Sequence, residues 1–95
     1  MESGIDWSEF PSPMDFNTQA EWALEFTKWR KSNRTSQTLF AIKLGISQGF
    51  VSAIETCRET ISNITKEYLS ELKANGPEAA RTKRKELLIE KIIAG

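Results

Sequence analysis

The segment Gln37–Thr56, with the sequence QTLFAIKLGISQGFVSAIET, constrains the fold of this chain more than any other. Its apolar residues recur every three or four positions on either side of a short break, which predicts two short helices joined by a tight turn. The first helix is expected over Thr38–Leu44, and the second is expected to begin at Ser47 or Gln48. Gly45 suits the left-handed residue that ends a helix, and Ser47 can accept hydrogen bonds from the free amides of the next one.

The spacing of the apolar residues also divides this segment into an inner and an outer face. The inner face carries Phe40, Ala41, Leu44, Ile46, Val51 and Ile54. The outer face of the second helix carries Gln48, Gly49, Ser52 and Ala53. Two short helices that share an apolar inner face and turn a polar face outward form a helix-turn-helix, whose second helix is normally inserted into the major groove of DNA.

The composition is that of one small folded domain. The chain has 95 residues, of which 27% are charged and 39% hydrophobic, and these are ordinary fractions for a folded soluble protein. It contains no apolar run near the roughly 20 residues that cross a bilayer, and its first residues lack the pattern of a signal peptide. We therefore expect a cytoplasmic protein with no membrane partner.

Side chains that carry chemistry are scarce. The chain has no histidine and a single cysteine, Cys57, which leaves no internal disulfide and no set of zinc ligands. It also lacks a glycine-rich phosphate loop, and its carboxylates are accounted for as helix caps, ion pairs and solvated faces. We therefore expect neither enzymatic activity nor a cofactor.

The formal net charge is zero, but the charges are distributed unevenly. Residues 1–25 carry six acidic side chains and no lysine or arginine, whereas residues 26–60 carry six basic and two acidic side chains. Residues 61–95 carry seven basic and five acidic ones. Because salt screens charges beyond about 8–10 Å, a phosphate backbone responds to the local charge. The predicted helix-turn-helix lies in the basic section.

The N-terminal 15 residues have no helical period and contain Pro11 and Pro13, so they are expected to form an extended arm that is acidic and aromatic. Their apolar side chains are too many for a solvated tail; these are Ile5, Trp7, Phe10 and Met14. Two interpretations remain open for them. The arm either packs on the outside of the helical core or is a segment that binds a partner.

Three further helices are expected, at residues 18–32, 65–74 and 78–93. The first begins where Thr18 and Glu21 have the spacing of a capping box. Asn63 or Thr65 is expected to cap the second, and Gly76 is expected to end it. The sequence thus predicts an all-α, compact five-helix bundle, with the arm at residues 1–15, a DNA-binding core at 16–76 and a C-terminal helix at 77–95.

Four parts of the sequence carry a family resemblance: Thr35–Gln37, Phe40–Ala41, Leu44–Gln48 and Val51–Glu55. In this register they resemble the phage-repressor (Xre/Cro-like) helix-turn-helix family over about residues 20–74. The resemblance implies a lambda-repressor-like bundle and double-stranded DNA as the partner. It also implies regulation of transcription, with repression in a phage or other mobile element as the expected role.

The resemblance assigns roles to individual residues. In the family, an arginine seven residues before the second-helix glutamine meets a glutamate near the end of the third helix, and these positions are Arg30 and Glu55 here. The pair is implied to be a structural ion pair. Gln37 is implied to contact a backbone phosphate, and Gln48 to bond the edge of an adenine.

Further DNA contacts are expected around Gln48. Ser52 and Ala53 follow on the outer face, where Ala53 can touch the methyl group of a thymine. Phe50 either makes a similar contact or packs against the second helix or the arm. The remaining candidates for the DNA interface are Ser47, Gly49 and two phosphate contacts, Lys43 and Arg58.

Two residues depart from the pattern of the family. Cys57 stands where the family often has a glycine that ends the recognition helix, so this helix is expected to end differently or to run on. Gly49 replaces a larger polar residue on the outer face. It removes one base contact and costs about 1 kcal/mol of helix stability relative to alanine.

The end of the last helix carries more apolar residues than a monomer of this size can bury, namely Leu87, Leu88, Ile89, Ile92 and Ile93. Helix-turn-helix proteins usually bind two half-sites as dimers. We therefore expect this helix to form a homodimer. Its basic first half either faces DNA or is solvated.

Two functions are consistent with these patterns. The first is a sequence-specific transcriptional regulator that binds operator DNA as a homodimer. The second is a protein-interaction module, similar to an antiactivator, that keeps the fold but binds another regulatory protein. The acidic aromatic arm, the neutral total charge and Gly49 favour the second function, whereas the basic helix-turn-helix favours the first.

Overall fold

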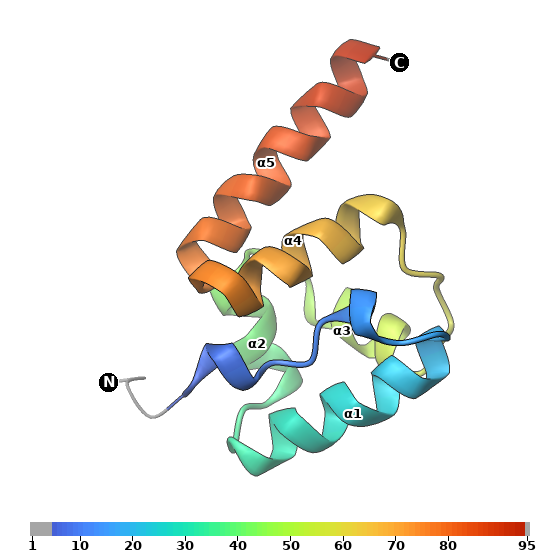
Figure 1. Ribbon diagram of the computed structural model, residues 1–95, viewed down its shortest axis with the longest axis vertical. Coiled ribbons are helices and arrows are strands. Elements are labelled where there is room, and N and C mark those ends of the chain that lie inside the picture. Colours follow the sequence, from blue (N-terminus) through green and yellow to red (C-terminus); the bar gives the residue numbers. More distant parts are fainter. Residues whose placement is uncertain (1–4, 95) are drawn as a thin grey trace.

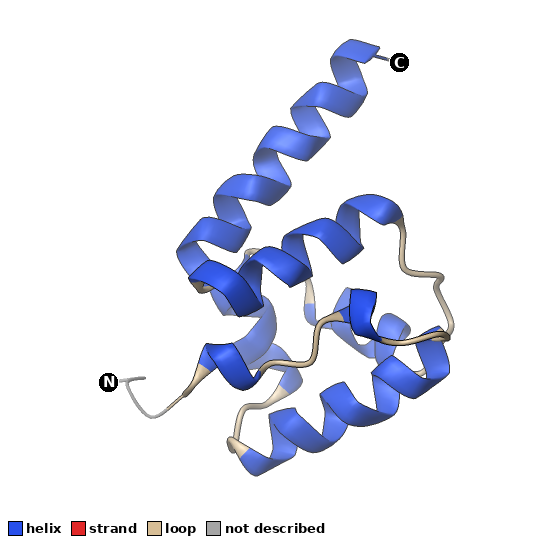
Figure 2. Cartoon of the chain, viewed as in Figure 1, coloured by secondary structure: helices blue, strands red, loops and turns tan. Residues whose placement is uncertain are grey.

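The computed structural model describes residues 5–94, and in this range the chain is all-helical, with no strand (Figure 1, Figure 2). Its elements in chain order are the 3-10 helices η1 (Trp7–Glu9) and η2 (Pro13–Asp15) and the α-helices α1 (Gln19–Ser32), α2 (Gln37–Leu44), α3 (Gln48–Glu55), α4 (Asn63–Asn75) and α5 (Pro77–Ala94). The predicted all-α class is confirmed, and the five α-helices lie within one or two residues of the predicted ranges.

The ends of the helices follow the capping residues. Thr18 and Glu21 form the predicted capping box at the start of α1. Gly45 adopts the left-handed conformation with φ 70° at the end of α2, and the Ser47 hydroxyl accepts from the Phe50 amide at 3.0 Å. The start of α4 was predicted wrongly. Ser62 caps it by accepting from the amide nitrogen of the third helical residue at 3.2 Å, so α4 begins earlier than expected.

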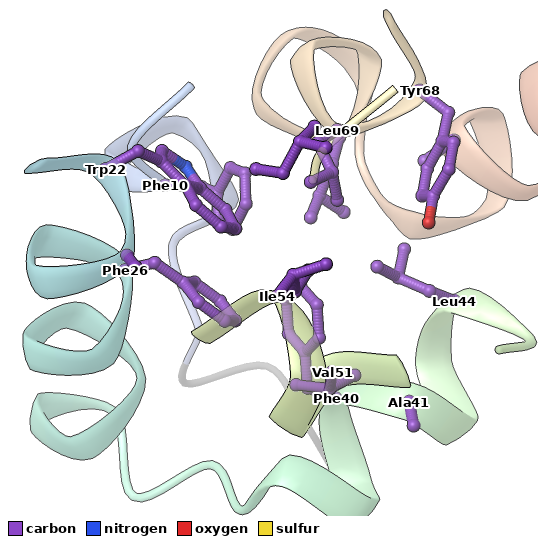
Figure 3. Packing of buried hydrophobic residues seen from close by; sticks show 14 residues of the cluster. Phe10, Trp22, Phe26, Phe40, Ala41, Leu44, Val51, Ile54, Tyr68 and Leu69 are labelled. Carbon is purple, nitrogen blue, oxygen red and sulfur yellow. The ribbon is translucent and has the colours of Figure 1, made fainter. Parts of the chain in front are cut away.

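The core is built around a cluster of aromatic rings between the helices (Figure 3). Phe10, Phe26 and Phe40 are each 0% exposed. The Phe10 ring stacks on Phe40 at a centroid distance of 5.9 Å and meets Phe26 edge-on at 5.7 Å. Trp22 stacks on Phe26 at 5.0 Å, and its indole nitrogen donates to the Pro11 carbonyl at 2.9 Å. Such ring pairs add about 0.5–1.5 kcal/mol each beyond the burial of their area.

The N-terminal segment is part of this core, and the expectation of an extended arm is wrong for its described residues. Asp6 and Ser12 cap the two 3-10 helices η1 and η2, which fold the segment across α1 and α4. Phe10 lies inside the core rather than on its outside, while Met14 is 57% exposed. A partner therefore has no access to Phe10 in this fold. Residues 1–4 of the predicted arm lie outside the described residues.

The two halves of α5 have different surroundings. The first half packs on the body of the molecule, where Ala80 is fully buried and Arg84 lies over the Tyr68 ring of α4 at 5.8 Å. Arg81 donates to the Lys43 carbonyl in the last turn of α2 at 2.7 Å. These two basic side chains are thus neither simply solvated nor extended away from the protein. The second half of α5 projects away from the other helices (Figure 1).

Candidate nucleic-acid interface

The helices α2 and α3 place the predicted recognition residues on one surface. The turn between them is closed by a hydrogen bond from the Ile46 amide to the Ala41 carbonyl at 3.0 Å. Val51 and Ile54 are fully buried beneath α3. Because these side chains fix the rotation of α3 about its axis, its first turn carries an exposed Gln48 and an exposed glycine.

An ion pair fastens the end of α3 to α1. Arg30 Nε donates to Glu55 Oε2 at 2.8 Å, and Arg30 Nη2 donates to Oε1 at 3.1 Å. The third guanidinium nitrogen, Nη1, donates to the Thr35 carbonyl at 3.0 Å. The side chains of Arg30 and Glu55 are 10% and 6% exposed. The expected structural pair is therefore present, and it is two-pronged, the geometry in which arginine and carboxylate bind most specifically.

Two glutamines extend this ion pair to the surface. The Gln37 side-chain amide donates to Glu55 Oε1 at 2.9 Å. The Gln48 side-chain amide donates in turn to Gln37 Oε1 at 2.7 Å. In these hydrogen bonds Gln37 uses one side-chain N–H and its oxygen, so it keeps its second N–H. Gln48 uses one side-chain N–H, so it keeps its second N–H and its acceptor oxygen. The predicted phosphate contact and the predicted base contact are thus held side by side.

Ala53 does not lie where the sequence pattern placed it. The residue is 3% exposed, so the prediction that it points outward to a thymine methyl is wrong. The Ala53 carbonyl accepts from the amides of Arg58 and Glu59 at 2.8 and 3.3 Å. These bonds fold the chain back against α3 directly after the helix ends. A helical period takes no account of such a returning loop.

Phe50 and Ser52 flank the outer face without standing free on it. Phe50 is half-buried and packs against the edge of the core, which supports the packing interpretation of this residue. Ser52 is half-buried, and its hydroxyl accepts from Arg58 Nη2 at 3.1 Å. Arg58 Nε also donates to the Thr56 hydroxyl at 3.1 Å. The guanidinium of this expected phosphate contact therefore lies along the exposed side of α3.

Cys57, two residues after the end of α3, adopts the left-handed conformation that a glycine often adopts after a helix. Its φ is 61°, in the left-handed region that costs residues with a Cβ about 1–2 kcal/mol. The helix ends at Glu55 and does not run on. The cysteine side chain is exposed.

Sequence reasoning missed a residue that holds the other side of α3. The Gln19 side-chain amide donates to the carbonyls of Ile54 and Glu59 at 3.1 and 2.7 Å, and its oxygen accepts from the Ile61 amide at 2.9 Å. Gln19 thereby ties the loop after α3 to the start of α1. A glutamine in the first turn of a helix carries no distinctive pattern, so no sequence signal marks this role.

The five apolar residues at the end of α5 divide into two groups. Leu87 and Leu88 are half-buried, whereas Ile89, Ile92 and Ile93 are 56%, 78% and 79% exposed. The exposed three share one side of the helix at the spacing i, i+3 and i+4. Together they form an apolar stripe, a little more than one helical turn long, that the described part of the chain does not cover.

Of the other candidates, Lys43 is half-buried in the last turn of α2, and Ser47 and Gly49 are exposed at the start of α3. No cluster of three acidic, cysteine or histidine side chains suited to a metal ion occurs between residues 5 and 94. Within the same range, no helix combines the length and the hydrophobicity that a bilayer span requires. Comparison of the chain with protein-family models, characterised proteins and solved structures gave no significant match.

Proposed function

We propose that this protein is a lambda-repressor-like helix-turn-helix regulator that inserts α3 into the major groove of operator DNA as a homodimer. The observation that carries the proposal is the hydrogen-bonded chain from Arg30 through Glu55 and Gln37 to Gln48. It fixes the carboxamide of an exposed residue at the start of α3. A glutamine carboxamide held in this position can bond N6 and N7 of an adenine together.

The surroundings of this carboxamide support a phosphate backbone as the neighbouring surface. The N-terminus of α2 lies beside the Gln48 carboxamide. Gln37 occupies the first position of this helix and keeps one side-chain N–H that makes no bond to Glu55 or Gln48. Helix N-termini attract phosphate through their unpaired amides and their dipole. Arg58 lies along α3 within reach of the same surface.

The homodimer would use the apolar stripe of Ile89, Ile92 and Ile93. One recognition helix touches few base pairs, and a second copy supplies the second half-site about 34–36 Å away. Replacing Ile92 and Ile93 together by glutamate places two charges in such an interface, so light scattering should show a monomer. Leu24→Glu is the matched control, because Leu24 is an exposed apolar residue of α1, 58% exposed and away from the stripe.

A binding titration on labelled duplex DNA across a salt series tests the DNA interaction. Each released counterion contributes about −0.9 to the slope of log K against log salt, so contacts to at least four phosphates predict a slope steeper than about −3. Gln48→Ala should reduce binding to specific DNA more than binding to random DNA, because it removes a base contact. Thr82→Ala, an exposed change on α5, should alter neither.

A second function, binding of another regulatory protein, is favoured by the same apolar stripe together with the neutral net charge. Such a module would show no salt-dependent DNA binding, and its stripe would bind a different protein. Absence of DNA binding at low salt supports this function over the first.

A further inference from the structure

A groove of about 350 Å³ opens beside the candidate recognition helix, between α3, α4 and α5. Its walls come from the turn before α3 and the first turn of α3, from the first half of α4 and from the middle of α5. The residues that line it are Ile46, Ser47, Phe50, Ser62, Ile64, Thr65, Tyr68, Arg84, Leu88 and Lys91. The volume lies within the range of about 300–1,000 Å³ that is typical of sites for small molecules.

The charge of this groove has one sign. No acidic residue lines it, although the chain has as many acidic as basic side chains. Arg84 is half-buried, and its described contact is the face of the Tyr68 ring at 5.8 Å. None of the ion pairs between residues 5 and 94 supplies Arg84 or Lys91 with a carboxylate. A half-buried guanidinium without a counter-ion favours the binding of an anion.

A buried hydroxyl accompanies this cation. Tyr68 is 1% exposed, and its hydroxyl makes no hydrogen bond of standard geometry, although Thr65 and Arg84 lie near it. In Figure 3 the Tyr68 side chain extends from α4, and its hydroxyl points away from that helix. Burial raises the pKa of the hydroxyl above its usual value, and the charge of Arg84 opposes the shift. A neutral tyrosine hydroxyl is a good donor, and leaving a buried donor unpaired costs about 1–3 kcal/mol.

Apolar side chains also line the groove. Phe50 of α3, Ile64 of α4 and Leu88 of α5 contribute hydrocarbon surface. The Ser47 hydroxyl at the edge accepts from the Phe50 amide and keeps its own proton to donate. The groove therefore combines cationic and hydrogen-bond-donating side chains with hydrocarbon surface.

We propose that this groove binds a small amphipathic carboxylate, with its charged end at Arg84 and Tyr68 and its hydrocarbon body against Phe50 and Leu88. The binding itself is independent of DNA, but its regulatory consequence rests on the proposed function. A bound molecule would contact both α3, which is proposed to enter DNA, and α5, which is proposed to form the dimer. Its differential contacts would change the affinity for DNA.

The test is a titration of the isotope-labelled full chain with octanoate, followed by amide chemical shifts in nuclear magnetic resonance. We expect saturable shifts that centre on Phe50, Thr65 and Leu88. Octanol, which has the same hydrocarbon body without the charge, should bind about tenfold more weakly or worse. Arg84→Met and Tyr68→Phe should each weaken octanoate, whereas Lys28→Met on the exposed side of α1 should not.

Three results would overturn the groove proposal. The first is an absence of saturation by about 10 mM octanoate, a concentration that reveals dissociation constants in the millimolar range. The second is equal binding of octanol and octanoate. The third is displacement of octanoate by equimolar inorganic phosphate, which would make the groove a simple phosphate site. Tyr68→Phe keeps the test interpretable if Arg84→Met unfolds the chain, because it removes only the hydroxyl and keeps the buried ring.

A DNA titration with and without saturating octanoate separates this proposal from the proposed function. Octanoate binding without any DNA binding would leave the groove intact and refute the regulator. DNA binding without octanoate binding would do the reverse. Where both bind, we expect the affinity for DNA to change at least about fivefold, and an unchanged affinity would refute the coupling.

Discussion

Replacement of Glu55 by glutamine tests the ion pair that fastens α3 to α1. The substitution keeps the shape of the side chain and one acceptor oxygen, but it leaves the Arg30 guanidinium without a counter-charge. With side chains only 10% and 6% exposed, solvent screens this pair weakly. Removing one partner of such a buried pair costs about 3–5 kcal/mol. Glu55→Gln should therefore lower the free energy of unfolding by that amount, a large part of the roughly 5–15 kcal/mol of a typical domain.

Equilibrium unfolding in urea measures this loss, with an unchanged slope showing that the surface exposed on unfolding is the same. Lys28→Gln is the matched control. The pair of Lys28 with Glu25 has side chains 64% and 46% exposed, so its loss should cost less than about 0.5 kcal/mol. The double variant of Arg30→Met and Glu55→Met should cost less than its two single variants together, because neither charge is left unpaired. A cost below about 1 kcal/mol for Glu55→Gln would refute this account of how α3 is held.

Three further predictions concern the core and its edges. Phe10→Ala should lower the free energy of unfolding by about 3–5 kcal/mol, because it empties a fully buried site. Met14→Ala, at a site that is 57% exposed, should lower it little. Similar losses for the two variants would contradict the placement of the N-terminal segment. Cys57→Gly should raise the free energy of unfolding by about 0.5–1 kcal/mol, since the relief of the left-handed strain exceeds the entropy cost of glycine, and Cys57→Ala should give no gain. Tyr68 is the chain's one tyrosine, so an absorbance titration reports it alone, with a midpoint above about 10 in the folded state and near 10 in urea. Since the pKa of Tyr68 is higher in the folded state, the contribution of this group to stability is complete below about pH 10 and declines as the pH rises toward the folded pKa. Tyr68→Phe should remove this decline. An unshifted midpoint would contradict burial of the hydroxyl.

Local chemistry made much of the fold predictable. Thr18, Glu21, Gly45 and Ser47 fix the ends of the first three α-helices, because each satisfies backbone groups within three residues of itself. The spacing of apolar residues identified the buried side of α2 and α3, because residues three and four positions apart share one face of a helix. The pairing of Arg30 with Glu55 came from the family resemblance and is seen in the structure.

Contacts between distant segments were not predictable in this way. Phe10 enters the core through two 3-10 helices that are too short to show a period. Ala53 is buried beside a loop that folds back after α3, where the amides of Arg58 and Glu59 donate to its carbonyl. The groove beside Tyr68 depends on the direction in which α5 leaves α4, which no local pattern of residues determines.

Selection from a random library of duplex DNA tests the central claim most directly. A homodimer with α3 in the major groove should enrich two inverted half-sites whose centres lie about 10–10.5 base pairs apart. Gln48→Ala should still bind DNA but lose the preference at one position of each half-site, whereas Thr82→Ala should select the same sequence as the natural chain. Failure to enrich any sequence, or enrichment that Gln48→Ala leaves unchanged, would contradict the assignment of α3 as the helix that recognises DNA.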